Sequence, residues 1–297
     1  MRENGDFFLS GDATDMGYVN VRDSERLKSA RAFTESLWPI YRPYADRHFR
    51  EDAMHHFLQR FWEMYVTCAL INRGFQLERV GNEGPEFYFL CEGRRIWVEA
   101  IAPNPGDGQD RVPESKLEQA YSVPEEKILM RYTHALREKH RQYESALAKG
   151  IVQPNDQILL AINCRGIPHA PNGADIPYIL KAFLPLGALT LALDHKTMEV
   201  KDSFHQRREA VVKKVGSPVA TTSFLDPKFS VFCAILHSAA DCTNHPLRLG
   251  DDFLVLHNPT ALPPLPTNLF SWYRQFEFQG ETLQEIPTVG MPNTLCS

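Results

Sequence analysis

The first strongly periodic segment of the chain spans residues 51–72. Its apolar positions recur at intervals of three and four, which predicts an amphipathic helix. The residues on that face are Met54, Phe57, Leu58, Phe61, Tyr65, Cys68 and Ala69. Residues 1–50 carry a weaker pattern. Residues 24–37 are compatible with a short helix, and Pro39 and Pro43 among aromatic neighbours suggest an extended segment that covers the core.

Three short runs typical of strands follow the helix, at residues 75–80, 86–91 and 95–101. Gly74 separates the helix from the first run. Glu92-Gly93 predicts a tight turn that joins the second and third runs as a hairpin. Residues 102–121 are rich in Pro, Gly and Asp and are interpreted as a loop.

A second, longer helix is predicted after this loop. Ser122-Val123-Pro124-Glu125 has the residues of a capping box with proline in the first turn, and Gly150 supplies the stop. The apolar run at residues 157–163 then predicts a buried strand.

The rest of the chain gives weaker signals. Residues 178–193 are apolar and fit either a helix or a strand, and residues 204–215 are charged and mixed. Further strands are predicted at residues 229–237 and 253–257, followed by a proline-rich stretch at 259–266. We therefore predict one α/β domain over residues 51–297, with residues 1–50 as an N-terminal cover segment and a C-terminal elaboration.

Composition agrees with a globular protein: 43% of the 297 residues are hydrophobic and 23% are charged. The net charge of −5 argues against a protein that coats nucleic acid nonspecifically, but it leaves room for a local basic cleft. The six cysteines form no CxxC pair, which favours reduced, buried thiols over disulfides or zinc. Without a hydrophobic signal segment or an apolar run of ~18 residues, we expect a cytoplasmic protein with no membrane partner.

The candidate chemistry centres on two glutamates. Glu86 follows a Gly-Pro turn at the start of one predicted strand, and Glu99 lies near the end of the next, within the apolar run Ile96-Trp97-Val98-Glu99-Ala100. Carboxylates on adjacent strand ends can converge on one Mg²⁺ or Mn²⁺ ion. Such an ion activates water and neutralises charge on a phosphodiester.

This arrangement resembles the PD-(D/E)XK nuclease superfamily over about residues 51–163. The resemblance implies a restriction-endonuclease-like central mixed sheet flanked by helices. It also implies Glu86 and Glu99 as metal ligands, Glu63 on the preceding helix as a third acidic participant, and DNA as the nucleic acid. The implied function is a Mg²⁺-dependent endonuclease that acts in defence or repair.

The sequence departs from the family pattern in two places. The first acid is Glu rather than Asp, and Ile101 occupies the usual position of the lysine. Some family members supply this lysine from a neighbouring helix. In the second helix, Lys139 falls within the apolar stripe, where a lysine must extend to solvent or meet a carboxylate such as Glu99. We therefore predict that Lys139 replaces the missing lysine.

Other interpretations remain open for each of these residues. Glu99 is also compatible with a structural ion pair, Glu86 with a simple turn, and Lys139 with a side chain that extends to solvent. The helical wheel places Glu63 opposite the main apolar face, which favours a solvated side chain. The alternative function is a catalytically inactive nuclease-fold protein that binds nucleic acid or a partner protein. A hydrolase of another class that uses the same carboxylates is a third possibility.

The nearby arginines and the histidines do not distinguish between these functions. Arginines flanking the site are compatible with phosphate contacts or with ordinary surface positions; they are Arg94, Arg95, Arg111, Arg131 and Arg141. The histidines lack the spacing of zinc ligands, and there is no Walker loop, GxGxxG, GxSxG or HExxH motif.

Overall fold

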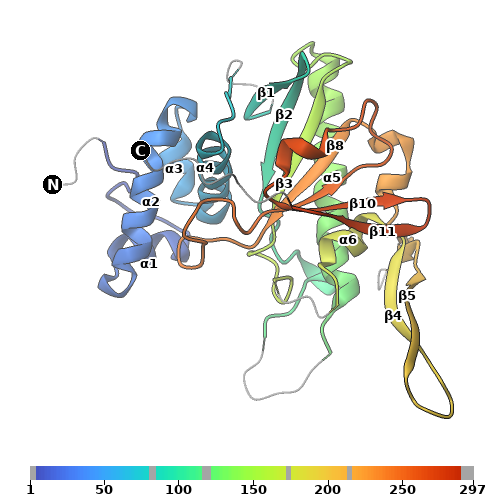
Figure 1. The fold of residues 1–297 in the computed structure, drawn as a ribbon. Coiled ribbons are helices and arrows are strands. Elements are labelled where there is room, and N and C mark those ends of the chain that lie inside the picture. The colour runs from blue at the N-terminus through green and yellow to red at the C-terminus, as the bar shows by residue number, and fades with distance from the viewer. Residues whose placement is uncertain (1–4, 80–84, 116–121, 172–174, 213–215, 289–297) are drawn as a thin grey trace, which may run out of the picture.

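The chain forms a large mixed β-sheet between layers of helices, as Figure 1 shows for the computed structural model. The structure describes residues 5–79, 85–115, 122–171, 175–212 and 216–288. Val80, Gly84 and Cys296, which belong to features predicted above, lie outside these ranges. The α-helices are α1 (Met16–Asp23), α2 (Lys28–Tyr41), α3 (Phe49–Ala53), α4 (Phe57–Asn72), α5 (Glu125–Ala148) and α6 (Tyr178–Phe183).

The main sheet has seven strands within the described residues, in the order β1-β2-β3-β8-β9-β10-β11. Strands β2, β3 and β8 run parallel, and β1 pairs antiparallel with β2 through the predicted hairpin. The bounds are β1 (Phe87–Cys91), β2 (Arg94–Ile101), β3 (Gln157–Asn163), β8 (Phe232–Ser238), β9 (Leu254–His257), β10 (Arg274–Gln279) and β11 (Thr282–Ile286). The predicted α/β class is therefore confirmed, and the predicted strand at residues 157–163 has the observed bounds.

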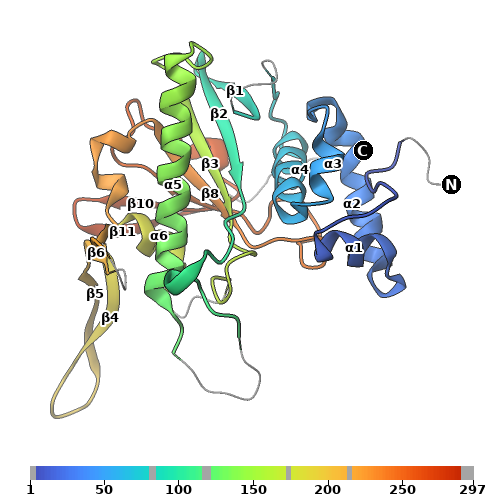
Figure 2. The ribbon, with the colours of Figure 1, turned by 180° about the vertical axis from the view of Figure 1, so that it is seen from behind.

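Two apolar cores lie on the two faces of this sheet. Helix α4 covers one face, where Val98 and Ala100 of β2 point, and α5 covers the other, where Trp97 points. Figure 2 shows α5 crossing its face of the sheet. Because side chains alternate along a strand, Glu99 and Ile101 share the α5 face with Trp97. This alternation decides which helix can contact Glu99.

The N-terminal segment is helical, so the predicted extended cover is wrong. Pro39 lies inside α2, whose Trp38 and Tyr41 are buried in the α4-side core together with Phe7 and Phe49. These aromatic contacts outweigh the helix-breaking tendency of proline, which is placed near the C-terminal end of the helix.

The helix predicted at residues 51–72 is divided into α3 and α4. Met54 marks the break, because its carbonyl oxygen accepts hydrogen bonds from the backbone N–H groups of Thr14 and Asp15. The Asp15 side chain in turn accepts from the N–H of Phe57, the first residue of α4, at 2.9 Å. A contact with a distant segment therefore replaces the continuous helix that the local pattern predicts.

Two further predictions at element ends are wrong. Of the run predicted at residues 75–80, the described part, residues 75–79, forms no regular strand; Glu78 makes an isolated bridge with Tyr88, while Phe75 packs against Phe89 and Phe270. The predicted capping box is absent as well. Helix α5 has Pro124 as its N-cap residue and no side-chain cap hydrogen bond.

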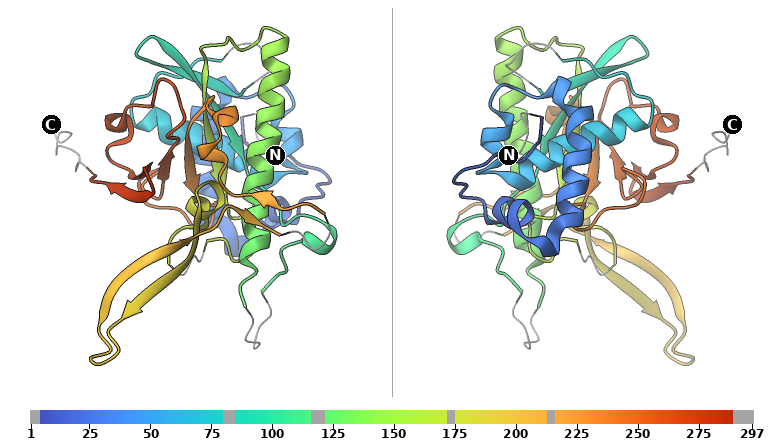
Figure 3. Two further views of the ribbon diagram at one scale, coloured as in Figure 1. Left: turned by 90° about the vertical axis from the view of Figure 1, so that its right-hand side faces the viewer. Right: turned by 90° about the vertical axis from the view of Figure 1, so that its left-hand side faces the viewer.

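The C-terminal part contains the elements that the sequence resolves least. The ambiguous stretch at residues 178–193 divides into α6 and the strand β4 (Leu186–Leu193), which pairs with β5 (Val200–Arg207). This hairpin projects from the body of the molecule, as both views of Figure 3 show. A short pair, β6 (Ala210–Val211) and β7 (Val219–Ala220), follows. Strands β10 and β11 were not predicted.

Cysteine chemistry agrees with the expectation of reduced, buried thiols. The five cysteines within the described residues are buried and free; they are Cys68, Cys91, Cys164, Cys233 and Cys242. Among the helices that the structure describes, none combines the length and apolar character needed to cross a membrane.

Candidate functional site

The predicted contact between Lys139 and Glu99 is present. Glu99 pairs with Leu160 of β3 and is only 8% exposed. Lys139 lies midway along α5, and its Nζ forms a short ion pair with Glu99 Oε2. The two side chains are 13% and 10% exposed, so the pair is largely shielded from water. Lys139, on the apolar stripe of α5, therefore contacts a carboxylate instead of extending to solvent.

The nearby carboxylates stabilise the charged form of Lys139. Burial by itself lowers the pKa of Lys139, but the negative charges of Glu99 and Glu86 outweigh that effect and raise it above its ordinary value. Lys139 is therefore an ammonium at any physiological pH. It can donate hydrogen bonds and stabilise negative charge, but it cannot accept a proton as a general base.

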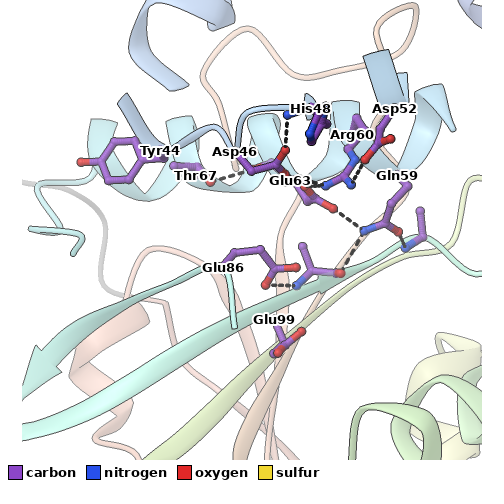
Figure 4. Close-up of polar contacts among 12 residues, drawn as sticks. Tyr44, Asp46, His48, Asp52, Gln59, Arg60, Glu63, Thr67, Glu86 and Glu99 are labelled. Atoms are coloured by element: carbon purple, nitrogen blue, oxygen red, sulfur yellow. Dashed lines mark hydrogen bonds and ion pairs between the residues drawn. The ribbon is translucent and has the colours of Figure 1, made fainter. Parts of the chain in front are cut away.

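Glu86 lies at the bend that precedes β1, in the position that faces Glu99 if the β1–β2 register continues by one residue. Its Oε2 accepts a hydrogen bond from the backbone N–H of Ala100 at 3.2 Å. Figure 4 shows Glu86 lying between Glu63 and Glu99. Burial and then the nearby charge of Glu99 raise the pKa of Glu86 well above its usual range, although Lys139 opposes the shift.

Gln59 of α4 completes the edge of β2 beyond the end of β1. Its Nε2 donates to the carbonyl oxygen of Ala100 at 3.0 Å, and its Oε1 accepts from the N–H of Ala102 at 2.7 Å. The side-chain amide thus makes the hydrogen bonds that the backbone of a neighbouring strand would otherwise make. Gln59 was not predicted. Its one sequence signal is its position one helical turn before Glu63, to which it also donates at 2.8 Å.

Glu63 is buried, so the expectation of a solvated side chain is wrong. It is 4% exposed, because α1, α2 and α3 cover the side of α4 that the helical wheel left to solvent. Arg60 Nη1 contacts Glu63 Oε2 at 2.8 Å, and Arg60 also pairs with Asp52 at 2.7 Å. Burial raises the pKa of Glu63, with Arg60 and Gln59 opposing. Its hydrogen bonds and ion pair, to Gln59, Arg60 and Thr67, lie within α4, as Figure 4 shows.

A cavity of about 360 Å³ opens beside the Glu99–Lys139 pair. Its lining residues come from the start of the β1 segment, from β2 and from the C-terminal half of α5; they include Pro85, Glu86, Glu99, Lys139, Gln142, Tyr143 and Lys149. Glu86, Glu99 and Lys139 therefore share one solvent-accessible space. Glu63 does not line it.

Ile101 lies two residues after Glu99 on the same face of β2. It is half-buried and packs against the α5-side core. Ile101 thus occupies the position that the resemblance gives to the lysine, on the same face of β2 as Glu99, whereas Lys139 reaches Glu99 from α5.

Most of the arginines considered above as phosphate contacts are paired with other groups of the protein. Arg95 pairs with the buried Asp156 at 2.8 Å, and Arg94 donates to Gln157 at 2.6 Å. Arg131 donates to the Asn104 carbonyl oxygen at 2.9 Å. Arg111 lies 3.7 Å from Glu114, and Arg141 is exposed on α5.

Glu86 and Glu99 are the two carboxylates of this cavity that could contact a divalent cation. The described residues contain no group of three or more His, Cys, Asp or Glu side chains placed to hold a metal. Mg²⁺ commonly uses one or two carboxylates, with water and substrate oxygens in the other positions. Burial and the charge of Glu99 raise the pKa of Glu86, so a cation bound there would favour the ionised form of Glu86.

Comparisons with family models, curated proteins and solved structures give no match for this chain. The function proposed below is therefore inferred from the geometry of Glu86, Glu99 and Lys139.

Proposed function

We propose that the chain is a divergent PD-(D/E)XK-type nuclease that hydrolyses phosphodiester bonds in DNA with Mg²⁺ or Mn²⁺. The observation that carries this proposal is the contact of Lys139 with Glu99 beside Glu86, in one accessible cavity. The element order α4, β1, β2, α5, β3 supports the proposed restriction-endonuclease-like core. In that core the predicted strand at residues 75–80 is reduced to the bridge at Glu78.

Each side chain has a distinct part in this proposal. Glu86 and Glu99 would hold the metal, which when bound supplies Lewis-acid stabilisation of the phosphate and a water of lowered pKa. Lys139, fixed as an ammonium, would orient the attacking water or donate a hydrogen bond to a phosphate oxygen. Gln59 holds the Ala100–Ala102 backbone, and Glu63 holds Gln59, so both act as positioning residues.

One observation favours the alternative of a non-catalytic nuclease-fold protein. Ile101 is an apolar residue packed into the core at the usual lysine position. In this alternative the Lys139–Glu99 pair stabilises the fold and has no further role. The two proposals differ in what the removal of Glu99 does to the cleavage of nucleic acid.

The proposal is tested with purified protein and supercoiled plasmid in Mg²⁺ or Mn²⁺, with EDTA as the metal-free control. We expect metal-dependent nicking that Glu99→Ala abolishes. Glu138→Ala is the matched control, because Glu138 is an exposed neighbour of Lys139 on α5 that pairs with His134. Cleavage retained by Glu99→Ala would refute the site. An absence of cleavage on plasmid, single-stranded DNA and RNA would favour the non-catalytic alternative.

A further inference from the structure

A second cavity lies at the carboxyl ends of the parallel strands β3 and β8. Its volume is about 710 Å³, and it is lined by the segments that follow both strands and by parts of α6 and β9. In α/β sheets, ligands bind outside the carboxyl ends of the strands. The volume is in the range of small-molecule sites. None of its lining residues lines the Glu86–Glu99 cavity.

One wall of this cavity presents an uncharged hydrogen-bonding ring. His237, the penultimate residue of β8, lines the cavity, and its Nε2 lies 3.0 Å from the hydroxyl oxygen of Tyr132 of α5. Burial lowers the pKa of His237 to about 4, so the ring is neutral at physiological pH. When the Tyr132 hydroxyl donates to Nε2, the ring proton is on Nδ1, which can then donate a hydrogen bond.

The lining also includes a carboxylate, Asp252, for which the described residues provide no ion-pair partner. Asp252 accepts hydrogen bonds from two hydroxyl groups, that of Tyr65 at 2.8 Å and that of Ser238 in a short contact. Both donors are neutral. Two hydrogen bonds leave part of the acceptor capacity of a carboxylate unused. Asp252 itself is exposed toward solvent.

The other charged residues of the lining are already compensated. Asp251 pairs with Arg73, Asp175 pairs with Lys181 at 2.9 Å, and Arg274 pairs with Glu285 at 2.7 Å. Among the lining residues that the structure describes, Asp252 is therefore the charged group without an ion-pair partner. Phosphate-bearing ligands are disfavoured by this excess negative charge, and cations are attracted.

We propose that this cavity binds a small organic cation, a guanidinium or a primary amine on an apolar stem. Its charged group meets Asp252, where a charge-assisted hydrogen bond replaces water. Its apolar part packs against Tyr178 and Phe253, which line the same cavity. His237 Nδ1–H is the donor for an acceptor atom elsewhere on the ligand.

The charge requirement is tested on the full chain with butylguanidinium and butylurea, which have the same shape and differ in charge. Isothermal titration calorimetry is expected to show butylguanidinium binding roughly ten- to a hundredfold more tightly, as for a hydrogen bond to a charged group. Equal affinities, or no binding of butylguanidinium, would overturn the proposal. This comparison needs no variant, so it does not depend on the folding of a mutant.

Two substitutions then locate the binding. Asp252→Asn is expected to remove the preference for butylguanidinium. Asp251→Asn is the matched control, since it changes the adjacent residue of the same cavity and leaves Asp252 charged. An unchanged preference in Asp252→Asn, with circular dichroism showing the native fold, would refute the assignment. Because the two cavities share no lining residue, failure here leaves the nuclease proposal intact, and the reverse also holds.

Discussion

Removal of Lys139 is expected to destabilise the fold far more than neutralisation of Glu99. Lys139 is the cation that faces two carboxylates, Glu99 in direct contact and Glu86 nearby. Lys139→Met leaves Glu99 and Glu86 without this positive charge. Glu99→Gln instead leaves one lysine with one glutamate, and the new amide oxygen can still accept from the ammonium.

The burial of the pair sets the magnitude. With side chains 13% and 10% exposed, the pair belongs with buried ion pairs, in which loss of one partner costs about 3–5 kcal/mol. An exposed pair would contribute about 0–1 kcal/mol. We expect Lys139→Met to lower the free energy of unfolding by about 3–5 kcal/mol at pH 7.5. Glu99→Gln should cost at least about 1.5 kcal/mol less, since a charged hydrogen bond survives.

The deficit of Lys139→Met should depend on pH. Lys139 is among the charges that lower the pKa of Glu86, so its removal raises that pKa further above the unfolded value. A carboxyl group whose pKa is raised on folding reduces stability as pH rises above its unfolded pKa, and it costs nothing below that value. The deficit relative to wild type should therefore be large at pH 7.5 and shrink toward pH 4.

Urea unfolding at several pH values, followed by circular dichroism, measures these differences. Lys149→Met is the matched control, because Lys149 lines the same cavity but is exposed at the end of α5. It should change stability by less than about 0.5 kcal/mol. Equal costs for Lys139→Met and Glu99→Gln, or a deficit that does not change with pH, would contradict an arrangement in which Lys139 faces both Glu99 and Glu86.

Three further predictions follow from the same contacts. Mn²⁺ should raise the melting temperature of the wild type but not of Glu99→Gln, and equal increases in both proteins would exclude this metal site. Calorimetry in buffers of different ionisation enthalpy should also detect proton release when Mn²⁺ binds, because the pKa of Glu86 is raised. Glu86→Gln should raise the free energy of unfolding of the metal-free protein at pH 7.5, and this increase should vanish below about pH 4. A lower free energy of unfolding at neutral pH, measured with urea, would refute the raised pKa of Glu86. Gln59→Leu should cost about 1–3 kcal/mol in urea unfolding, because the Ala100 carbonyl and the Ala102 N–H lose their partner; a cost near zero would show that water replaces the amide.

The elements that the sequence predicted well are those with strong local signals. The hairpin at Glu92-Gly93 and the buried strand β3 each combine a distinctive turn or an unbroken apolar run. The position of Lys139 on an apolar stripe was informative for the same reason: a charge at a core-facing position needs a specific partner. One periodicity argument thus related α5 to Glu99, 40 residues earlier in the chain.

The failures arose where distant segments decide local structure. No local pattern shows that Thr14 and Asp15 bind the Met54 carbonyl and interrupt the predicted helix. The helical wheel likewise placed Glu63 in solvent, because it cannot represent the N-terminal helices that pack on that side of α4. Gln59 was missed because its role depends on where β1 begins. These errors all concern contacts between elements.

The central claim is that α5 supplies the lysine that is missing from β2. Ile101 lies two residues after Glu99 on the same face of β2, so a lysine introduced at position 101 is expected to reach Glu99 and to substitute in part for the one removed from position 139. The decisive measurement is the single-turnover rate of Mg²⁺-dependent plasmid nicking by wild type, Lys139→Met and the double variant Lys139→Met/Ile101→Lys. We expect Lys139→Met to reduce the rate by about a hundredfold or more, and Ile101→Lys to restore a substantial part of it. A Lys139→Met variant that cuts at the wild-type rate while Glu99→Ala is inactive would contradict the claim.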